Sequence, residues 1–161
     1  DNGTVWKDTN GDEIHAQGGN IIQEGATFHW FGMQYPIWKA VNHYTSTDLK
    51  TWTKQAPALT PGMSGIPFGA TNWVGRPFVM KNPNAGQTPY VMTIEWALGS
   101  ATVRNRFCFL TATSLDGPWT FHASKTINNF RIINKLLNII KPWFPIFVNL
   151  NSIQIYKITS R

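Results

Sequence analysis

An internal repeat constrains the fold of this chain more than any other feature of its sequence. The first unit contains "GGNIIQEGATFHWFG" and then "KAVNHYTSTDLKTW"; the second contains "GRPFVMKNPNAGQTPYVMTIEW" and then "RNRFCFLTATSLDGPW". Both units show a short strand pattern, a turn with Gly, an aromatic strand, a third strand, a Thr-Ser-x-Asp turn and a Trp. Self-similarity of this kind predicts two copies of one supersecondary unit.

The segments between these turns have the composition of β-strands. Residues 28–32, 90–96 and 107–113 are rich in aromatic and β-branched side chains, and Gly, Pro, Asn or Asp residues bound them. Before residue 127 we find no helical period. The sequence therefore predicts an all-β fold of about two blades of four-stranded antiparallel sheet, a partial β-propeller whose blades bury both faces only against neighbours.

Two residue types recur at matching places in the units. Trp52 and Trp119 follow the Thr-Ser-x-Asp turns, and we predict that both pack between sheets, with sugar contact as the alternative. Asp48 and Asp116 are predicted to cap these turns through their side chains, with catalysis as the alternative.

The stretch "KDTNGDEIHAQGG" begins like a calcium-binding loop, because Asp8, Asn10 and Asp12 alternate. Such a loop needs Gly at its sixth position and Glu at its twelfth, where this chain has Glu13 and Gly19. The sequence instead predicts a hairpin turn at residues 10–11, with both central residues at positive φ.

Charge and residue usage exclude several partners. Residues 1–126 hold nine Lys/Arg against all eight Asp/Glu, a balance of +1, so most of the net charge of +6 lies in the tail and no phosphate track is predicted. No apolar run reaches the ~18 residues of a membrane span. His29 and His43 lack metal-ligand spacing and Cys108 lies in an apolar run, so packed histidines and a buried thiol are expected, with no metal and no cofactor.

Residues 127–161 differ in kind from the repeat. They are rich in Ile, Asn and Lys, contain no Gly and no acid, and allow one short amphipathic helix that Pro142 and Pro145 would end. Our hypothesis is that this tail is not a natural continuation of residues 1–126 but the product of a frame shift or an intron read through. A helix that binds a membrane surface or a protein partner is the alternative.

Four motifs, in order over about residues 5–122, resemble glycoside hydrolase family 43. The stretch "DTNGDEIHAQGGNIIQEGATFHWFG" resembles the opening of the five-bladed propellers related to exo-1,3-galactanases, and "HYTSTDLKTW", "GRPFVMKNP" and "SLDGPWTF" resemble later motifs. The resemblance implies a partial five-bladed β-propeller. It also implies a secreted, extracellular glycosidase that hydrolyses O-glycosyl bonds of plant-type polysaccharides of the galactan, arabinan or xylan class.

The same resemblance directs attention to the catalytic carboxylates. Inverting hydrolysis needs an acid and a base on opposite sides of the sugar. Where the galactanase-like relatives have the carboxylate of an E-R-P motif, this chain has Gly75. Glu95 is the candidate catalytic residue, and a structural ion pair with Arg76 or Arg104 is the equal alternative. The family's general acid comes from a third blade, so the chain is expected to be inactive alone.

The resemblance also suggests contacts to an oligosaccharide or polysaccharide substrate. His15 and Gln17 match the stretch that reaches the central funnel, and Gly18 and Gly19 would allow close approach of a ligand, with a structural turn as the alternative. The remaining candidates are two tryptophans expected on loops, as stacking platforms, and one arginine, which structural use could also explain: Trp38, Trp73 and Arg76. Trp30 and Trp96 are expected in the core.

Two rival functions remain at this level. Gly75 would suit a non-catalytic carbohydrate-binding propeller, and the tail would suit a membrane or protein interaction module. Two blades leave open edges and unburied faces, so non-specific self-association is expected.

Overall fold

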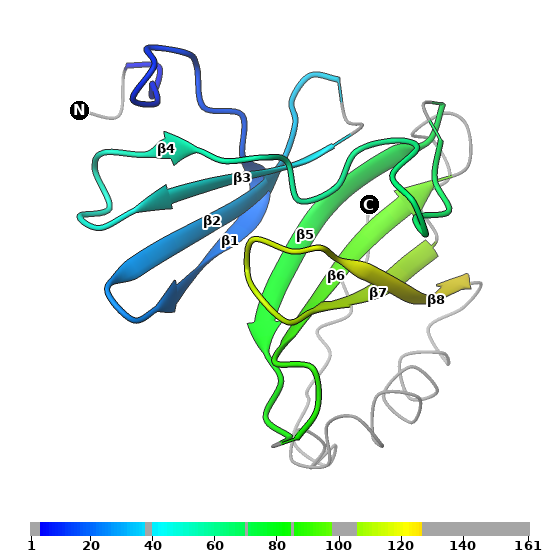
Figure 1. The fold of residues 1–161 in the computed structure, drawn as a ribbon. Helices are drawn as coiled ribbons and strands as arrows, with labels where there is room; N and C mark the ends of the chain where they lie inside the picture. Colours follow the sequence, from blue (N-terminus) through cyan, green and yellow to red (C-terminus); the bar gives the residue numbers. More distant parts are fainter. Residues whose placement is uncertain (1–3, 38–39, 70, 85, 98–105, 127–161) are drawn as a thin grey trace, which may run out of the picture.

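Two four-stranded antiparallel sheets make up the described part of the chain (Figure 1). The computed structural model describes residues 4–37, 40–69, 71–84, 86–97 and 106–126. The first sheet contains β1 (Gln17–Glu24), β2 (Thr27–Met33), β3 (Val41–Ser46) and β4 (Thr53–Lys54). The second contains β5 (Trp73–Lys81), β6 (Tyr90–Ala97), β7 (Arg106–Ala112) and β8 (Thr120–Thr126). Strand order follows sequence order in both sheets, which confirms the predicted all-β fold of two repeated units.

Local sequence explains the strands and their faces. β1 and β2 are joined by Gly25-Ala26, and Gly25 takes a φ of 58°, as the first central residue of a type II′ turn requires. Along β6, Tyr90, Met92, Ile94 and Trp96 point into the core. This alternation is the period-two pattern of a strand with one face in the core, and it buries Trp96 as expected.

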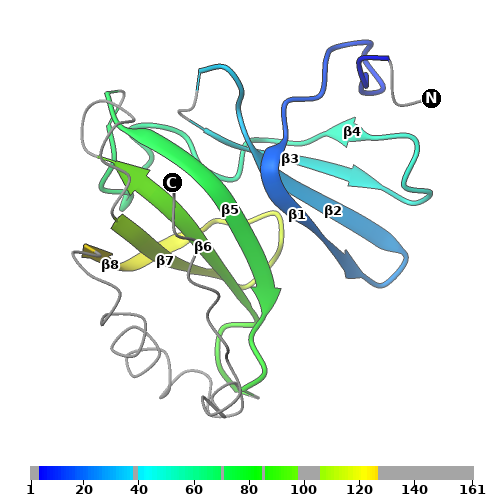
Figure 2. The ribbon, with the colours of Figure 1, turned by 180° about the vertical axis from the view of Figure 1, so that it is seen from behind.

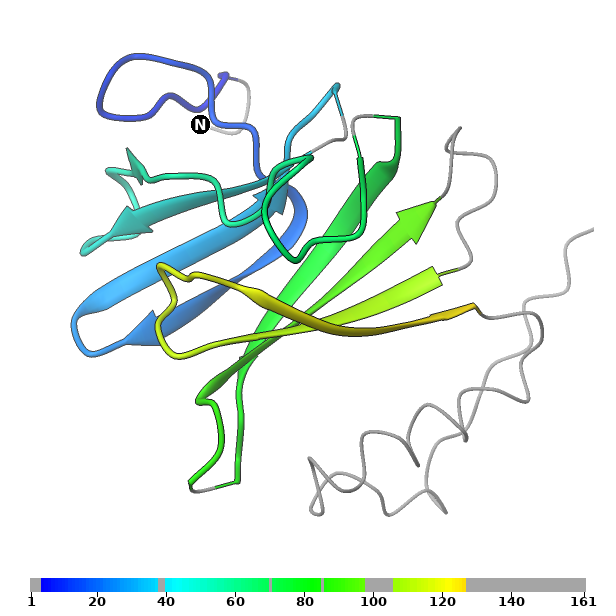
Figure 3. The ribbon, with the colours of Figure 1, turned by 45° about the vertical axis from the view of Figure 1, so that its right-hand side comes forward.

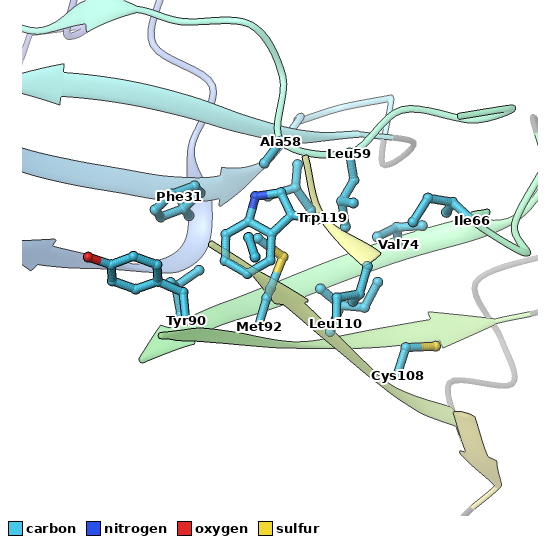
Figure 4. Packing of buried hydrophobic residues seen from close by; sticks show 14 of the residues in the cluster. Phe31, Ala58, Leu59, Ile66, Val74, Tyr90, Met92, Cys108, Leu110 and Trp119 are labelled. Carbon is cyan, nitrogen blue, oxygen red and sulfur yellow. The ribbon is translucent and has the colours of Figure 1, made fainter. Parts of the chain in front are cut away.

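The core lies between the two sheets. β1 and β5, the first edge strand of each sheet, lie side by side where the sheets meet (Figures 2 and 3). Phe31 from the first sheet packs edge-on against Trp119 from the second, with ring centroids 6.0 Å apart (Figure 4). Trp119 therefore packs between sheets as predicted. Trp52 instead joins Tyr44 and Ala16 in a second cluster on the opposite face of the first sheet.

The predicted turns differ in detail from the structure. Asp8 Oδ1 accepts hydrogen bonds from the amides of Asn10 and Asp12, so this carboxylate caps the turn. Gly11 has a φ of 86° whereas Asn10 is not at positive φ, so the expected turn with two positive φ angles is wrong. The Gly11 amide donates to the Asp8 carbonyl at 2.9 Å, so Thr9 and Asn10 are the central residues of the turn, and neither of them needs a positive φ.

Asp48 caps its turn as predicted. Its Oδ1 accepts hydrogen bonds from the amides of Lys50 (2.8 Å) and Thr51 (2.7 Å) and from the Ser46 hydroxyl (2.9 Å). The hydrogen bonds that the Thr51 and Lys50 amides donate to Asp48, together with those from the Ser46 and Thr51 hydroxyls, stabilise its carboxylate. They hold the pKa of Asp48 below its usual range. Asp116 behaves differently: no amide in the described part of the chain donates to its carboxylate.

The outer face of the second sheet remains partly open. Phe78, Thr93, Phe109 and Ala123 lie in register across the four strands, and the Phe78 side chain is 50% exposed. Within the described residues there is no helix that could span a membrane. The hypotheses for the tail concern residues 127–161, which lie outside the described residues. Self-association stays a prediction that this open face supports.

Candidate functional site

An ion pair between β5 and β6 brings two of the sequence candidates together. Arg76 Nη1 lies 2.9 and 3.0 Å from the two carboxylate oxygens of Glu95. The Glu95 side chain is 12% exposed and that of Arg76 is 59% exposed, so the pair lies at the rim of the sheet. Of the alternatives left open for Glu95, the structure shows the arginine partner; Arg104 lies outside the described residues.

A β-bulge positions this pair. The register between β5 and β6 shifts between Gly75 and Phe78, with Gly75 opposite Glu95. Within the bulge, Arg76 takes a φ of 48°, a left-handed conformation that costs an L-residue about 1–2 kcal/mol. This conformation directs the guanidinium to Glu95, so strain in the backbone accompanies the ion pair.

Gly75 is the residue that departs from the galactanase-like motif, and the structure shows why no side chain fits there. A Cβ at this position would lie 2.4 Å from Trp73 Cη2 and 2.7 Å from Met33 Sδ. The Trp73 indole thus occupies the space that a carboxylate side chain would need. A Glu at position 75 requires Trp73 or Met33 to move.

The expectation that Trp73 lies on a loop is wrong. It is the first residue of β5, its side chain is only 5% exposed, and it packs with Met33 and Ala97. The absence of a Cβ at Gly75 creates the space that buries the indole, which leaves little ring surface for a sugar. The other predicted platform, Trp38, lies outside the described residues.

Gly18 and Gly19, the second and third residues of β1, have different structural roles. A Cβ on Gly18 would lie 3.7 Å from Arg76 Cγ, so the arginine stem crosses β1 at this residue. A Cβ on Gly19 would lie 1.7 Å from the Phe31 carbonyl oxygen, so Gly19 is required for the approach of β2. Close approach of a ligand is therefore not needed to explain Gly19.

His15 and Gln17 share a pocket, as their sequence neighbourhood suggested. This N-terminal pocket has a volume of about 380 Å³, and its lining combines aromatic, apolar and polar side chains: Trp6, Glu13, Ile14, His15, Ala16, Gln17, Trp30 and Tyr35. Trp6 and Tyr35 are about half exposed, and Trp6 meets Trp30 edge-to-face at 5.9 Å. Sequence reasoning missed Trp6, Glu13 and Tyr35 because they flank the repeat motifs.

Buried polar groups fix the backbone of His15. Its amide donates to the Tyr44 hydroxyl at 3.1 Å, and its carbonyl accepts from Asn42 Nδ2 at 2.8 Å. Burial raises the pKa of Tyr44, so this phenol stays protonated. The third strand of the first sheet thus presents His15 to the N-terminal pocket.

The site as a whole has two parts joined by the start of β1. Gln17 belongs to the N-terminal pocket, and the adjacent Gly18 lies beneath the Arg76 stem. Among the described residues, one group of three side chains of metal-ligand type, His29, His43 and Asp116, lies close together, and it is outside this site. The polar and aromatic side chains of this site are suited to bind a neutral polyol. Of the carboxylates in the site, Glu95 is the one beside the β-bulge.

Comparisons with known proteins give matches among solved structures. No protein-family model matches the chain, and no curated protein matches it significantly. An exo-β-1,3-galactanase from Phanerochaete chrysosporium, solved with galactose, is 36% identical with a TM-score of 0.67, and the alignment covers 77% of this chain and 29% of that enzyme. The same enzyme has been solved with β-1,3-galactotriose.

Two further relatives agree. An exo-β-1,3-galactanase from Clostridium thermocellum is 30% identical with a TM-score of 0.66, covering 76% of this chain and 26% of that chain. A family 43 β-1,3-galactosidase, solved with galactodeoxynojirimycin, is 32% identical with a TM-score of 0.68, covering 78% and 38%. The chain thus spans well under half the length of these relatives. In sequence and fold, its described residues match part of the β-propellers of glycoside hydrolase family 43, including exo-β-1,3-galactanases, over less than half of their length.

Proposed function

We propose that this chain is part of a glycosidase that hydrolyses O-glycosyl bonds of a plant-type polysaccharide, with β-1,3-linked galactan as the substrate. The observation that carries the proposal is the 36% identity to an exo-β-1,3-galactanase that has been solved with galactose and with β-1,3-galactotriose. A polymeric plant substrate lies outside cells, so the proposal includes secretion of the protein.

The N-terminal pocket is the proposed saccharide-binding element. His15, Gln17 and Glu13 offer hydrogen-bonding groups to sugar hydroxyls, and the half-exposed rings of Trp6 and Tyr35 offer flat apolar surface. Arg76, whose side chain is 59% exposed and whose stem lies near Gly18 beside Gln17, is the proposed donor to a further sugar hydroxyl. These roles require only side chains that the structure already places at the surface.

Hydrolysis needs more than this part supplies. An inverting enzyme holds its two carboxyl groups ~6.5–9.5 Å apart, with room for water. In this chain Glu95 is paired with Arg76, and Gly75 stands where the galactanase-like motif has a carboxylate. We therefore expect the isolated chain to bind galactan oligosaccharides without turning them over.

A titration of the full chain with β-1,3-galactotriose, followed by calorimetry and by chromatographic detection of galactose, tests this proposal. Binding without galactose release is expected, and His15→Ala or Gln17→Ala should weaken it roughly 10-fold, the equivalent of one hydrogen bond. Gln23→Ala, at an exposed position of β1, is the matched control. No binding of galactotriose, or equal binding of xylotriose, would contradict the galactan assignment.

A non-catalytic carbohydrate-binding propeller is the second candidate, and the blocked space at Gly75 favours it. A chimera separates the two. Residues 4–126 replace the matched part of the Phanerochaete chrysosporium enzyme, and galactose release from β-1,3-galactan is measured. Release supports the glycosidase; binding of galactotriose with no release supports the non-catalytic protein.

A further inference from the structure

Two histidines and an aspartate meet where the two sheets adjoin. His29 lies on β2, His43 on β3, and Asp116 on the turn between β7 and β8, which reaches toward the first sheet (Figure 3). One ligand atom from each residue lies within 4.8 Å of the others. Along β1, the N-terminal pocket adjoins Gln17 whereas His29 is paired with Ile22, so the three residues lie toward the opposite end of the strand.

The two imidazoles are held in a defined geometry. His29 Nδ1 lies 2.9 Å from His43 Nε2, with ring centroids 5.1 Å apart and an interplanar angle of 14°. Rings with these values are nearly coplanar and meet nitrogen to nitrogen. The Phe31 ring stacks on His43 with centroids 4.4 Å apart, which fixes the orientation of that imidazole.

Burial keeps both histidines in the form that binds metals. It lowers the pKa of His29, and together with the neighbouring His29 it lowers the pKa of His43 to about 4. Neutral imidazole has a free lone pair on one nitrogen, and this is the state in which histidine coordinates a metal ion. The 2.9 Å contact places a proton on one of the two facing nitrogens, so that ring must carry its proton on its other nitrogen when both rings bind the ion.

The Asp116 carboxylate is available as a metal ligand because it does not cap its own turn. The equivalent Asp48 accepts amide and hydroxyl hydrogen bonds within its own turn. The Asp116 carboxylate lies instead 3.8 Å from His43 Nδ1, and its side chain is 69% exposed. This difference between two otherwise similar turns directs one carboxylate toward the histidine pair and leaves that side open to solvent.

We propose that His29, His43 and Asp116 bind a divalent transition-metal ion, with Zn²⁺ as the best fit, and that the ion joins the first sheet to the second. Two imidazoles and one carboxylate suit Zn²⁺ with water as a fourth ligand, whereas Ca²⁺ requires a shell of oxygen atoms. Zn–N bonds of ~2.0–2.1 Å in a tetrahedral site place two nitrogens ~3.3 Å apart. The His29–His43 contact must therefore lengthen by a few tenths of an ångström, and the two rings must tilt so that both lone pairs point to the ion and not along the line between the two nitrogens.

The test uses the full chain, stripped with a chelator and titrated with ZnCl₂ by calorimetry, while Co²⁺ supplies a visible absorption band as a spectroscopic signature. We expect saturable binding at one site and a rise in Tm, because a ligand of the folded state stabilises it. Asp116→Asn should weaken the affinity at least ~10-fold. This substitution is exposed and preserves the fold, which circular dichroism checks; His29→Gln should weaken binding further.

His122→Gln is the matched control, because His122 is an exposed histidine of β8 outside the cluster. The tail contains no His, Cys, Asp or Glu that could compete. Absence of Zn²⁺ binding, equal affinities of the wild type and Asp116→Asn, or equal affinity for Ca²⁺ would each overturn the proposal. Binding of β-1,3-galactotriose does not enter this test, so the two proposals can fail separately.

Discussion

The side-chain amide of Asn20 in β1 makes two hydrogen bonds of 2.8 Å with the main chain of Val79 in β5: its Nδ2 donates to the carbonyl and its Oδ1 accepts from the amide. Both strands depart from regular pairing nearby, with register shifts between Gln17 and Asn20 and between Gly75 and Phe78. The amide thus acts as a peptide group that links the inner strands of the two sheets.

Asn20→Ala should lower the free energy of unfolding by about 2 kcal/mol, because it leaves a main-chain donor and acceptor of Val79 without partners. Urea denaturation measures the change. Gln23→Ala removes an exposed hydrogen bond to Gly25 in the same strand and should stay within about 0.5 kcal/mol of the wild type. Equal effects of both substitutions would contradict the role of Asn20.

Arg76→Ala should destabilise the protein more than Glu95→Gln does. Without Arg76, a carboxylate that is 12% exposed loses its partner, whereas Gln at position 95 can still accept a hydrogen bond. Since the Arg76 side chain is 59% exposed, solvent limits the loss to about 1–2 kcal/mol. Urea melts of both variants give the order, and a reversed order would show that the pair does not support the bulge.

Gly75→Ala should cost about 1–3 kcal/mol, because the new methyl group would overlap the Trp73 indole and Met33. Gly69→Ala is the control, since a Cβ there meets nothing within 4 Å. Thermal melts compare the two. A stable Gly75→Ala protein would mean that Trp73 moves readily, and a carboxylate at this position would then be structurally allowed.

Acid should destabilise the protein through His43. Its pKa lies at about 4 in the folded state and at 6.5 when unperturbed, so the unfolded chain takes up a proton first as the pH falls. The contribution is absent above pH 6.5 and grows as the pH falls to about 4, where it reaches about 3 kcal/mol. Metal-free urea melts at pH 7.5 and pH 4.5 measure it.

His43→Gln supplies the control for this pH dependence. It should reduce the difference in unfolding free energy between the two pH values, while the acid sensitivity due to His29, whose pKa burial also lowers, remains. Asp48 does not enter this range, because a carboxylate whose pKa is lowered in the folded state loses its contribution only below its ordinary pKa of 3.8. An unchanged difference would assign the acid sensitivity to other groups.

Phe78→Lys should reduce self-association of the chain. Phe78 is half exposed on the outer face of the second sheet, in register with Thr93 and Phe109, and a charge there disfavours stacking of that face. Sedimentation velocity measures the weight-average mass. Leu49→Lys removes an exposed apolar side chain from a turn and should have little effect; equal effects of the two would point to non-specific hydrophobicity.

The sequence alone determined the strands, their order and the faces of their side chains. The alternation around Glu95 in β6 and the capping by Asp48 follow from interactions between neighbours in the chain or in one hairpin. Such interactions depend on period-two patterns and turn residues, which the sequence displays directly. The repeat of these patterns was sufficient to predict two similar sheets.

Only the tertiary structure decided how the sheets meet. It selected Arg76 as the observed partner of Glu95, buried Trp73 in the space left by Gly75, and brought Asp116 to the histidines of the first sheet. These outcomes depend on β-bulges and on the approach of strands that are distant in sequence, where a shift of one residue changes which side chains face each other. No local pattern encodes that approach, because it is set by packing of the whole core.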